Sequence, residues 1–165
     1  MKIPVIVALV LACAVASVPR PDPRDQILAS AHALIGRYPY SWGGGHAGSA
    51  GPSFGICQGY RGDIRPCPAT TTHGLDCSGL TRWVYEIGYD HDVLGPGTTD
   101  DHLRRMRPVN DPAPGDLVFF GTKKRTHHVG VYIGGGRMIN AFKTGTRVRV
   151  DPVNALDDLL GYYRL

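Results

Sequence analysis

Residues 76–87 have the sequence DCSGLTRWVYEI, in which a cysteine directly precedes a run of apolar residues at helical spacing. This spacing predicts a helix over Cys77–Ile87 that ends at Gly88. Cys77 would lie in the first turn, where unpaired backbone N–H groups and the helix dipole favour the thiolate form. We therefore expect a nucleophilic cysteine at the start of this helix.

The chain changes character after Pro114-Gly115, where short β-type segments alternate with glycine-rich or basic turns. The segments predicted as strands are 117–120, 128–133, 137–142, 147–150 and 162–165. Helices are predicted before them, one capped by Asp25 and ending at Gly36, and one near residues 100–107. Helices followed by a run of strands are typical of an α+β domain, in which helices cover one face of an antiparallel sheet.

The predicted strand over residues 128–133 begins with His128, a candidate base. Side chains alternate along a strand, so His127 and His128 are expected to point in opposite directions. A hairpin through the glycines at 134–136 would place Asn140 near His128. A cysteine, a histidine and a polar group that orients the histidine are the parts of a thiol hydrolase.

The first residues are predicted to be an export signal. Lys2 precedes an apolar run over Ile3–Val15, which is too short to span a membrane, and Ala14-Val15-Ala16 fits a small-x-small cleavage pattern. We assign residues 1–18 to a signal peptide, with no membrane segment expected after its removal. Lipid attachment at Cys13 is the alternative.

The remaining length and composition indicate one domain. Residues 19–24 are rich in proline and charge and are predicted to be an extended leader, which leaves residues 25–165 for a single domain. The formal net charge is only +4 and the basic residues are scattered, so nucleic acid is not an expected partner. We expect a secreted monomer.

A stretch rich in glycine, proline and serine over residues 43–74 is too long for an ordinary connection. It holds Cys57 and Cys67, which in an oxidising compartment are predicted to form a disulfide that contributes roughly 2–4 kcal/mol. The alternative is a metal site with His46 or His73, although the cysteines lack the close pairing of zinc ligands. We predict no metal and no cofactor.

Several motifs, in order, resemble those of the NlpC/P60 family, papain-like cysteine hydrolases of bacterial peptidoglycan. They are Tyr40-Ser41-Trp42-Gly43-Gly44, Asp76-Cys77-Ser78-Gly79, Pro114-Gly115-Asp116-Leu117-Val118-Phe119-Phe120 and His128-Val129-Gly130-Val131-Tyr132. Met138-Ile139-Asn140-Ala141 matches the segment that carries the third polar residue, where the family most often has His. The resemblance covers almost the whole chain after the signal. It implies a papain-like fold with the nucleophile helix packed on an antiparallel sheet.

The resemblance also implies a role for each matching catalytic residue. Cys77 is the expected nucleophile, and His128 is the expected general base and later acid. Asn140 is expected to fix the imidazole tautomer, since an amide oxygen can accept from an imidazole N–H. Tyr40 is expected to donate its hydroxyl to the oxyanion.

Other residues are candidates for binding substrate. By resemblance, Asp76 and Ser78 hold the stem peptide, including a free amine, although Asp76 is equally expected as an N-cap. Trp42 is expected to form a wall of the groove, and His46 and His73 are candidates for lining it. The other histidines are expected at the surface or away from the cleft: His32, His91, His102 and His127. For His127 the alternative is that a twist or bulge brings it to the edge of the cleft.

The predicted function is hydrolysis of an amide bond in the peptidoglycan stem peptide by a secreted enzyme, extracellular or associated with the cell wall. The predicted bond joins γ-D-glutamyl to the diamino acid that follows it. An amidase or acyltransferase with the same Cys-His chemistry, and a wall-binding module without catalysis, are the alternatives. The connection between Tyr40 and Cys77 is longer than in the shortest family members, which leaves the exact bond open.

Overall fold

The structure is a computed structural model that describes residues 21–165. The predicted signal peptide over residues 1–18, Cys13 within it, and residues 19–20 of the leader lie outside the described residues. Those predictions therefore stay predictions. Among residues 21–165, every helix is too short or too polar to cross a membrane.

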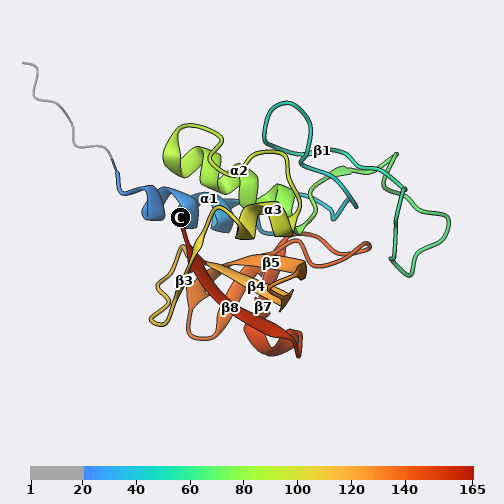
Figure 1. Cartoon of the computed structure of the whole chain (residues 1–165). Helices are drawn as coiled ribbons and strands as arrows, with labels where there is room; N and C mark the ends of the chain where they lie inside the picture. Colours follow the sequence, from blue (N-terminus) through green and yellow to red (C-terminus); the bar gives the residue numbers. More distant parts are fainter. Residues whose placement is uncertain (1–20) are drawn as a thin grey trace, which may run out of the picture.

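Most of the helical residues precede the strands that form the main sheet (Figure 1). The elements are α1 (Pro23–Leu34), β1 (Ser53–Phe54), β2 (His73–Gly74), α2 (Cys77–Tyr89), α3 (Thr99–Leu103), β3 (Arg107–Val109), β4 (Leu117–Thr122), β5 (Arg125–Gly134), β6 (Arg137–Asn140), β7 (Arg149–Pro152) and β8 (Leu159–Arg164). A 3-10 turn covers Val153–Ala155. The main sheet is antiparallel with strand order β3-β8-β4-β5-β6-β7, and β1 pairs with β2 separately.

The three helices lie on one side of the sheet, as the α+β prediction requires (Figure 1). Buried residues of α1 and α2, among them Ile27 and Leu80, share the main core with sheet residues such as Phe119 and Val131. A smaller cluster lies on the other face around Phe120. Burial of these apolar faces on both sides of the sheet holds the strands in register.

Helix α1 begins earlier than the sequence predicted. Asp22 is its N-cap and accepts a hydrogen bond from the Arg24 backbone N–H over 2.9 Å. Pro23 takes the first helical position, where a missing N–H breaks no helical hydrogen bond. The prediction of Asp25 as the N-cap was wrong, because the Asp-Pro pair starts the helix first. The last two residues of the predicted leader therefore belong to the fold.

Helix α2 was predicted to end at Gly88 but continues to Tyr89. A Cβ on Gly88 would lie 2.5 Å from Cγ1 of Ile27 and 2.8 Å from the carbonyl oxygen of Pro23. This glycine therefore permits close contact between α1 and α2. The helix ends at Asp90, which adopts the left-handed conformation with φ of 61°.

The helix predicted near residues 100–107 is shorter in the structure. Thr98 caps α3, which ends at Leu103, and residues 107–109 form an unpredicted strand that pairs with β8. The side chain of Asp101 accepts a hydrogen bond from the Thr98 backbone N–H over 2.7 Å. This capping box starts the helix, and the chain turns into β3 soon afterwards.

The long connection over residues 43–74, which we call the arm, projects to one side of the helices and the sheet in teal and green (Figure 1). Its first part is fixed to α2 by Arg82, which is 1% exposed. The guanidinium of Arg82 donates to the carbonyl oxygens of Gly45, Ala47 and Gly48 over 2.8 to 3.1 Å. It also pairs with Asp92 over 2.8 Å. These bonds satisfy the buried charge and anchor the arm beside the start of α2.

Candidate active site

The start of α2 lies against the beginning of the arm. Asp76 caps the helix as predicted, because its carboxylate accepts a hydrogen bond from the Gly79 backbone N–H over 2.7 Å. A Cβ on Gly79 would lie only 2.2 Å from the carbonyl oxygen of Gly44. The glycines of the two motifs therefore allow the backbones to touch. This contact places Cys77, a free and buried cysteine, next to the segment that carries Tyr40.

The Cys77 thiol is protonated in the resting protein. Burial, together with the nearby Asp76 carboxylate, raises its pKa to about 12. Backbone hydrogen bonds from Val129, Ser78 and Cys77 itself lower the pKa but do not outweigh burial. The backbone at the helix start therefore acts in the expected direction, but burial outweighs it and the thiol keeps its proton. The bond from Val129 also shows that the sulfur lies at β5, beside the residue that follows His128.

The hairpin between β5 and β6 brings Asn140 to His128, as predicted. Nε2 of the imidazole lies 2.9 Å from Oδ1 of the amide, and both residues are buried. Because an amide oxygen only accepts, Nε2 carries the hydrogen of the neutral ring. Nδ1 of His128 is then the nitrogen that can accept a proton.

His128 is neutral at physiological pH. Burial lowers its pKa to about 4, although the hydrogen bond to Asn140 acts in the opposite direction. A neutral imidazole is the form that accepts a proton from a thiol. The resting pair is therefore a neutral thiol and a neutral base.

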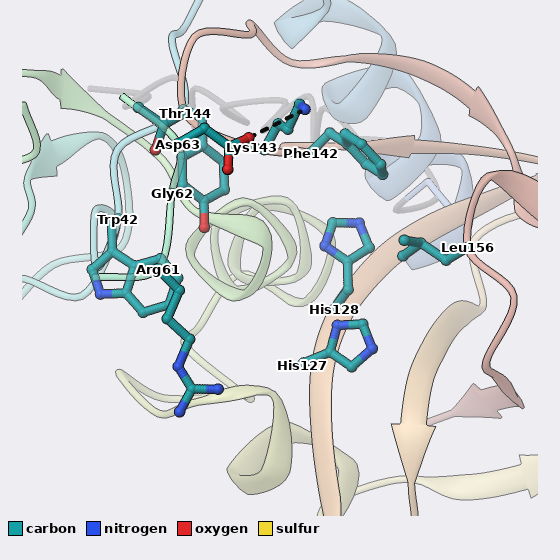
Figure 2. A pocket seen from close by; sticks show the side chains of 11 residues that line it. Trp42, Arg61, Gly62, Asp63, His127, His128, Phe142, Lys143, Thr144 and Leu156 are labelled. Atoms are coloured by element: carbon teal, nitrogen blue, oxygen red, sulfur yellow. Dashed lines mark ion pairs between the residues drawn. The ribbon is translucent and has the colours of Figure 1, made fainter. Parts of the chain in front are cut away.

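A groove of about 300 Å³ opens beside these residues, and Trp42 lines it, as the sequence predicted. Its lining residues are Tyr40, Trp42, Arg61, Gly62, Asp63, His127, His128, Phe142, Lys143, Thr144 and Leu156. Figure 2 shows Trp42 and Arg61 on one side of the groove, and His127 and His128 on the other. The groove therefore lies between the arm and the end of the sheet that carries His128.

Tyr40 lines the same groove and is itself buried. Burial raises the pKa of Tyr40 above its usual range, and the neighbouring Cys77 and Asp76 raise it too. The phenol therefore keeps its proton at every physiological pH. A neutral hydroxyl next to the cysteine is able to donate a hydrogen bond to a developing oxyanion.

His127 is exposed, as predicted, but it also lines the groove. Phe120 pairs with His128 and Gly121 pairs with Thr126, so His127 is the extra residue of a β-bulge. The bulge interrupts the alternation that would turn His127 away from His128. Its Nε2 lies 2.6 Å from Oδ2 of Asp158 at the rim of the groove.

The predicted substrate-binding residues Asp76 and Ser78 share a polar cluster with His46. Nε2 of His46 lies 2.9 and 3.0 Å from the two carboxylate oxygens of Asp76. The Ser78 hydroxyl donates to Asp76 over 3.1 Å and is also buried. His46 therefore contacts the helix cap, and it is not among the residues that line the groove.

Of two further histidines, one packs in the small sheet and the other is buried in the domain. His73, a candidate for the groove, instead packs its ring against Phe54 in the small sheet with centroids 5.2 Å apart. His102 was expected at the surface but is fully buried, and its Nε2 lies 3.1 Å from the carbonyl oxygen of Gly95. It is buried because α3 packs against the rest of the domain. His32 and His91 are exposed, as predicted.

The disulfide between Cys57 and Cys67 is present, which confirms that prediction and removes the alternative of these two residues as metal ligands. It closes a loop that brings Arg61, Gly62 and Asp63 to the groove. Asp63 pairs with Lys143 over 3.8 Å, as the dashed line in Figure 2 shows. This part of the chain has no periodicity from which these contacts were predictable.

Known proteins are similar to this chain in sequence. The family model described as "NlpC/P60 family" matches residues 36–156. Peptidoglycan endopeptidase RipA of Mycolicibacterium smegmatis is 37% identical over 122 residues, which are 70% of this chain and 20% of RipA. Peptidoglycan DL-endopeptidase CwlO of Bacillus licheniformis is 32% identical over 120 residues, which are 70% of this chain and 22% of CwlO. The chain thus spans about a fifth of the length of these relatives.

Solved structures of similar proteins have the same fold. RipD of Mycobacterium tuberculosis, described as a non-catalytic NlpC/p60 domain protein adapted to peptidoglycan binding, superposes with a TM-score of 0.68. The two are 26% identical, and the match covers 88% of this chain and 98% of RipD. The fold is therefore the papain-like α+β fold that the motifs predicted. The relatives include both endopeptidases and a binding protein.

Proposed function

This chain belongs to the NlpC/P60 family, and on that basis we propose that it is a cysteine hydrolase that cleaves the stem peptides of peptidoglycan. One observation carries the proposal. The sulfur of Cys77 lies at the backbone of Val129, which directly follows His128, and Nε2 of His128 donates to Oδ1 of Asn140 over 2.9 Å. The candidate nucleophile, base and orienting group thus lie together, and of these three His128 lines the groove.

The proposed reaction starts from the neutral pair. Nδ1 of His128 takes the proton of Cys77 while the sulfur attacks the carbonyl carbon of the amide. The Tyr40 hydroxyl donates to the oxygen that becomes negative. The imidazolium of His128 then protonates the leaving amine as the C–N bond breaks, which leaves a thioester on Cys77. Water, deprotonated by His128, hydrolyses the thioester and regenerates the thiol.

The proposed scissile bond joins γ-D-glutamyl to the diamino acid that follows it. CwlO, one of the relatives, is named a DL-endopeptidase, which supports this choice. The arm contributes three residues to the groove, including Arg61 and Asp63 of opposite charge. A charged wall of this kind fits a peptide substrate that carries free carboxyl and amino groups.

The proposal includes export to the cell wall. The disulfide between Cys57 and Cys67 supports an oxidising compartment, where such bonds persist. Peptidoglycan lies outside the cytoplasmic membrane, so a secreted enzyme would meet both its substrate and its oxidant there. Fractionation of cells that express the whole chain, followed by N-terminal sequencing of the exported form, tests this part of the proposal.

Mass spectrometry of digested muropeptides tests the reaction itself. The purified protein, with its disulfide intact, and its Cys77→Ala variant are incubated with the same muropeptides. We expect new fragments that map to the γ-D-glutamyl bond and that the variant does not produce. Fragments that depend on Cys77 but map to another amide would support a hydrolase and would contradict the proposed scissile bond.

A wall-binding role without catalysis is the competing function, because RipD is described in those terms. Its signature is that both proteins sediment with whole walls while every muropeptide stays intact. That result would overturn the hydrolase proposal. Binding of both proteins to the wall together with Cys77-dependent cleavage would instead support an enzyme that also holds its substrate.

A further inference from the structure

The NH2 group of Asn140 is hydrogen-bonded to a carboxylate that lies outside the sequence motifs. Nδ2 of Asn140 donates to Oδ2 of Asp151 over 2.9 Å. Asn140 is fully buried and Asp151 is 9% exposed. In the register of β6 and β7, Met138 pairs with Asp151 and Asn140 pairs with Arg149, so Asn140 and Asp151 are diagonal neighbours on one face.

This contact is the shorter of two that determine which end of the Asn140 amide faces His128, because Nδ2 also donates to the carbonyl oxygen of Arg149 over 3.5 Å. The oxygen and the NH2 group of an amide have nearly the same shape, so packing alone does not distinguish the two orientations. A carboxylate only accepts hydrogen bonds, so Asp151 holds the NH2 group and leaves the oxygen toward His128. The imidazole must then carry its hydrogen on Nε2.

Asp151 is in turn fixed by its own neighbours. Nε of Arg149 donates to Oδ2 of Asp151 over 2.8 Å. The Arg149 guanidinium lies over the ring of Phe142, 4.9 Å from its centroid, and that ring contacts His128 edge-on at 5.5 Å. Arg149 and Phe142 thus connect Asp151 to the imidazole by a second route, which does not pass through Asn140.

We propose that Asp151 is a positioning residue for the hydrolase reaction: through Asn140 it holds His128 in the tautomer whose Nδ1 accepts the Cys77 proton. This inference rests on the proposed function, because it assigns a role in that reaction. A neutral amide at the third position of the triad supplies no charge. Asp151 supplies a carboxylate one hydrogen bond further from the imidazole.

The charges around His128 determine how loss of Asp151 would change its titration. Burial and the adjacent His127 lower the pKa of His128, whereas Asp151 and Asp76 raise it. Arg149, bonded to Asp151, offsets part of that carboxylate's effect. Removal of the Asp151 charge should therefore lower the pKa of His128 further and move the acid limb of kcat to lower pH.

Two single variants test the proposal. Asp151→Asn keeps the shape but offers the Asn140 amide both a donor and an acceptor, and Asp151→Leu offers neither. We expect each to lower kcat by about 10- to 100-fold with KM within about twofold, since the groove itself is unchanged. Asp157→Asn is the matched control, because it removes an exposed carboxylate nearby and should leave kcat and the pH profile unchanged.

A double variant separates the role in orientation from a role in stability. Asn140→Asp combined with Asp151→Asn exchanges the two groups, so a carboxylate accepts from His128 and an amide donates to that carboxylate. We expect kcat to recover to within about fivefold of the wild type, with the acid limb moved to higher pH because a negative charge now contacts the imidazole. A purely structural role for Asp151 does not predict that the acid limb moves to lower pH in the single variants and to higher pH in the double variant.

Nitrogen NMR of the imidazole reads the tautomer without any turnover. In the unaltered protein we expect His128 to carry its hydrogen on Nε2, and in Asp151→Leu we expect a mixture of tautomers. An unchanged tautomer, or unchanged kcat and pH profile, in folded Asp151→Leu and Asp151→Asn would overturn the proposal. If the unaltered protein cleaves no muropeptide, the function fails, but the tautomer measurement still decides the effect of Asp151 on His128.

Discussion

The groove has two walls that are built in different ways. One, which we call the catalytic wall, presents His128 to the groove and has Asn140 and Asp151 behind it on neighbouring strands, and all three are buried. The other, the loop wall, consists of Arg61 and Asp63, which lie on the disulfide-closed loop at the surface. On the catalytic wall, hydrogen bonds of 2.9 Å join one residue to the next. On the loop wall, the ion pair to Lys143 spans 3.8 Å at the surface.

In the proposed reaction, this difference assigns the chemistry to the catalytic wall and the choice of substrate to the loop wall. Proton transfer needs atoms held at hydrogen-bond distance. Paired strands in a fixed register hold side chains with that precision because the strands are rigid. A surface loop holds its side chains more loosely, but it tolerates changes of sequence and length. We therefore expect variants of the catalytic wall to change kcat, and variants of the loop wall to change KM.

Tyr40→Phe should have the largest effect on turnover. Tyr40 is buried beside Cys77, and its neutral hydroxyl is the proposed oxyanion donor. Loss of one such donor lowers kcat by about 10²- to 10³-fold, with little change in KM. Steady-state kinetics on a purified muropeptide measure the effect. A change confined to KM would mean that Tyr40 belongs with the loop wall.

Acid should destabilise the catalytic wall through His128. Its pKa is lowered to about 4 from its ordinary value of 6.5, so the folded state binds fewer protons than the unfolded chain between these values. Stability is therefore fully present above about pH 6.5 and is lost as pH falls toward about 4. Denaturant unfolding across this range, with His128→Gln as the comparison, isolates the contribution.

Two other groups are expected to titrate in distinguishable ways. Burial also lowers the pKa of His102, so His102 also contributes to the loss of stability as pH falls. This contribution remains in the His128→Gln variant. Burial acts to raise the pKa of Asp116, but its bonds to Arg164 lower it overall, so its contribution is lost below its ordinary value of 3.8. A pH dependence identical in both proteins between pH 6.5 and 4 would contradict a buried neutral His128.

Removal of the disulfide should affect the loop wall. The double variant Cys57→Ser with Cys67→Ser should raise KM by about three- to tenfold, because the free loop must be ordered when substrate binds. The free energy of unfolding should fall by roughly 2–4 kcal/mol. We expect kcat to stay within about threefold, because none of the catalytic wall lies on this loop. A large loss of kcat in a folded protein would remove the distinction between the two walls.

Asp63→Asn should have the smallest effect. The pair between Asp63 and Lys143 joins two exposed side chains, which are 91% and 61% exposed, and pairs of this kind are weak and screened by salt. We expect KM to change by about twofold or less, and the change to disappear at high salt. A salt-independent change in kcat would instead place Asp63 in direct contact with the reacting group.

Local signals in the sequence were sufficient for the main elements. The apolar spacing after Cys77 predicted α2, and the β-type segment that begins with His128 predicted β5. The predicted ends of the helices were wrong where a residue type has more than one structural role. Gly88 allows helices to touch instead of ending a helix, and Asp22 caps α1 because Pro23 follows it.

Sequence by itself determined which side chains are candidates for the chemistry, their order, the expected disulfide partners and the α+β class, because these depend on residue type and on periodicity over a few residues. Tertiary structure alone decided the protonation of Cys77 and His128, the bulge that brings His127 to the groove, and the contact of Asp151 with Asn140. Burial and strand register depend on residues far apart in the chain. The charge states and the orientation of the buried amide therefore follow from packing, which no local pattern records.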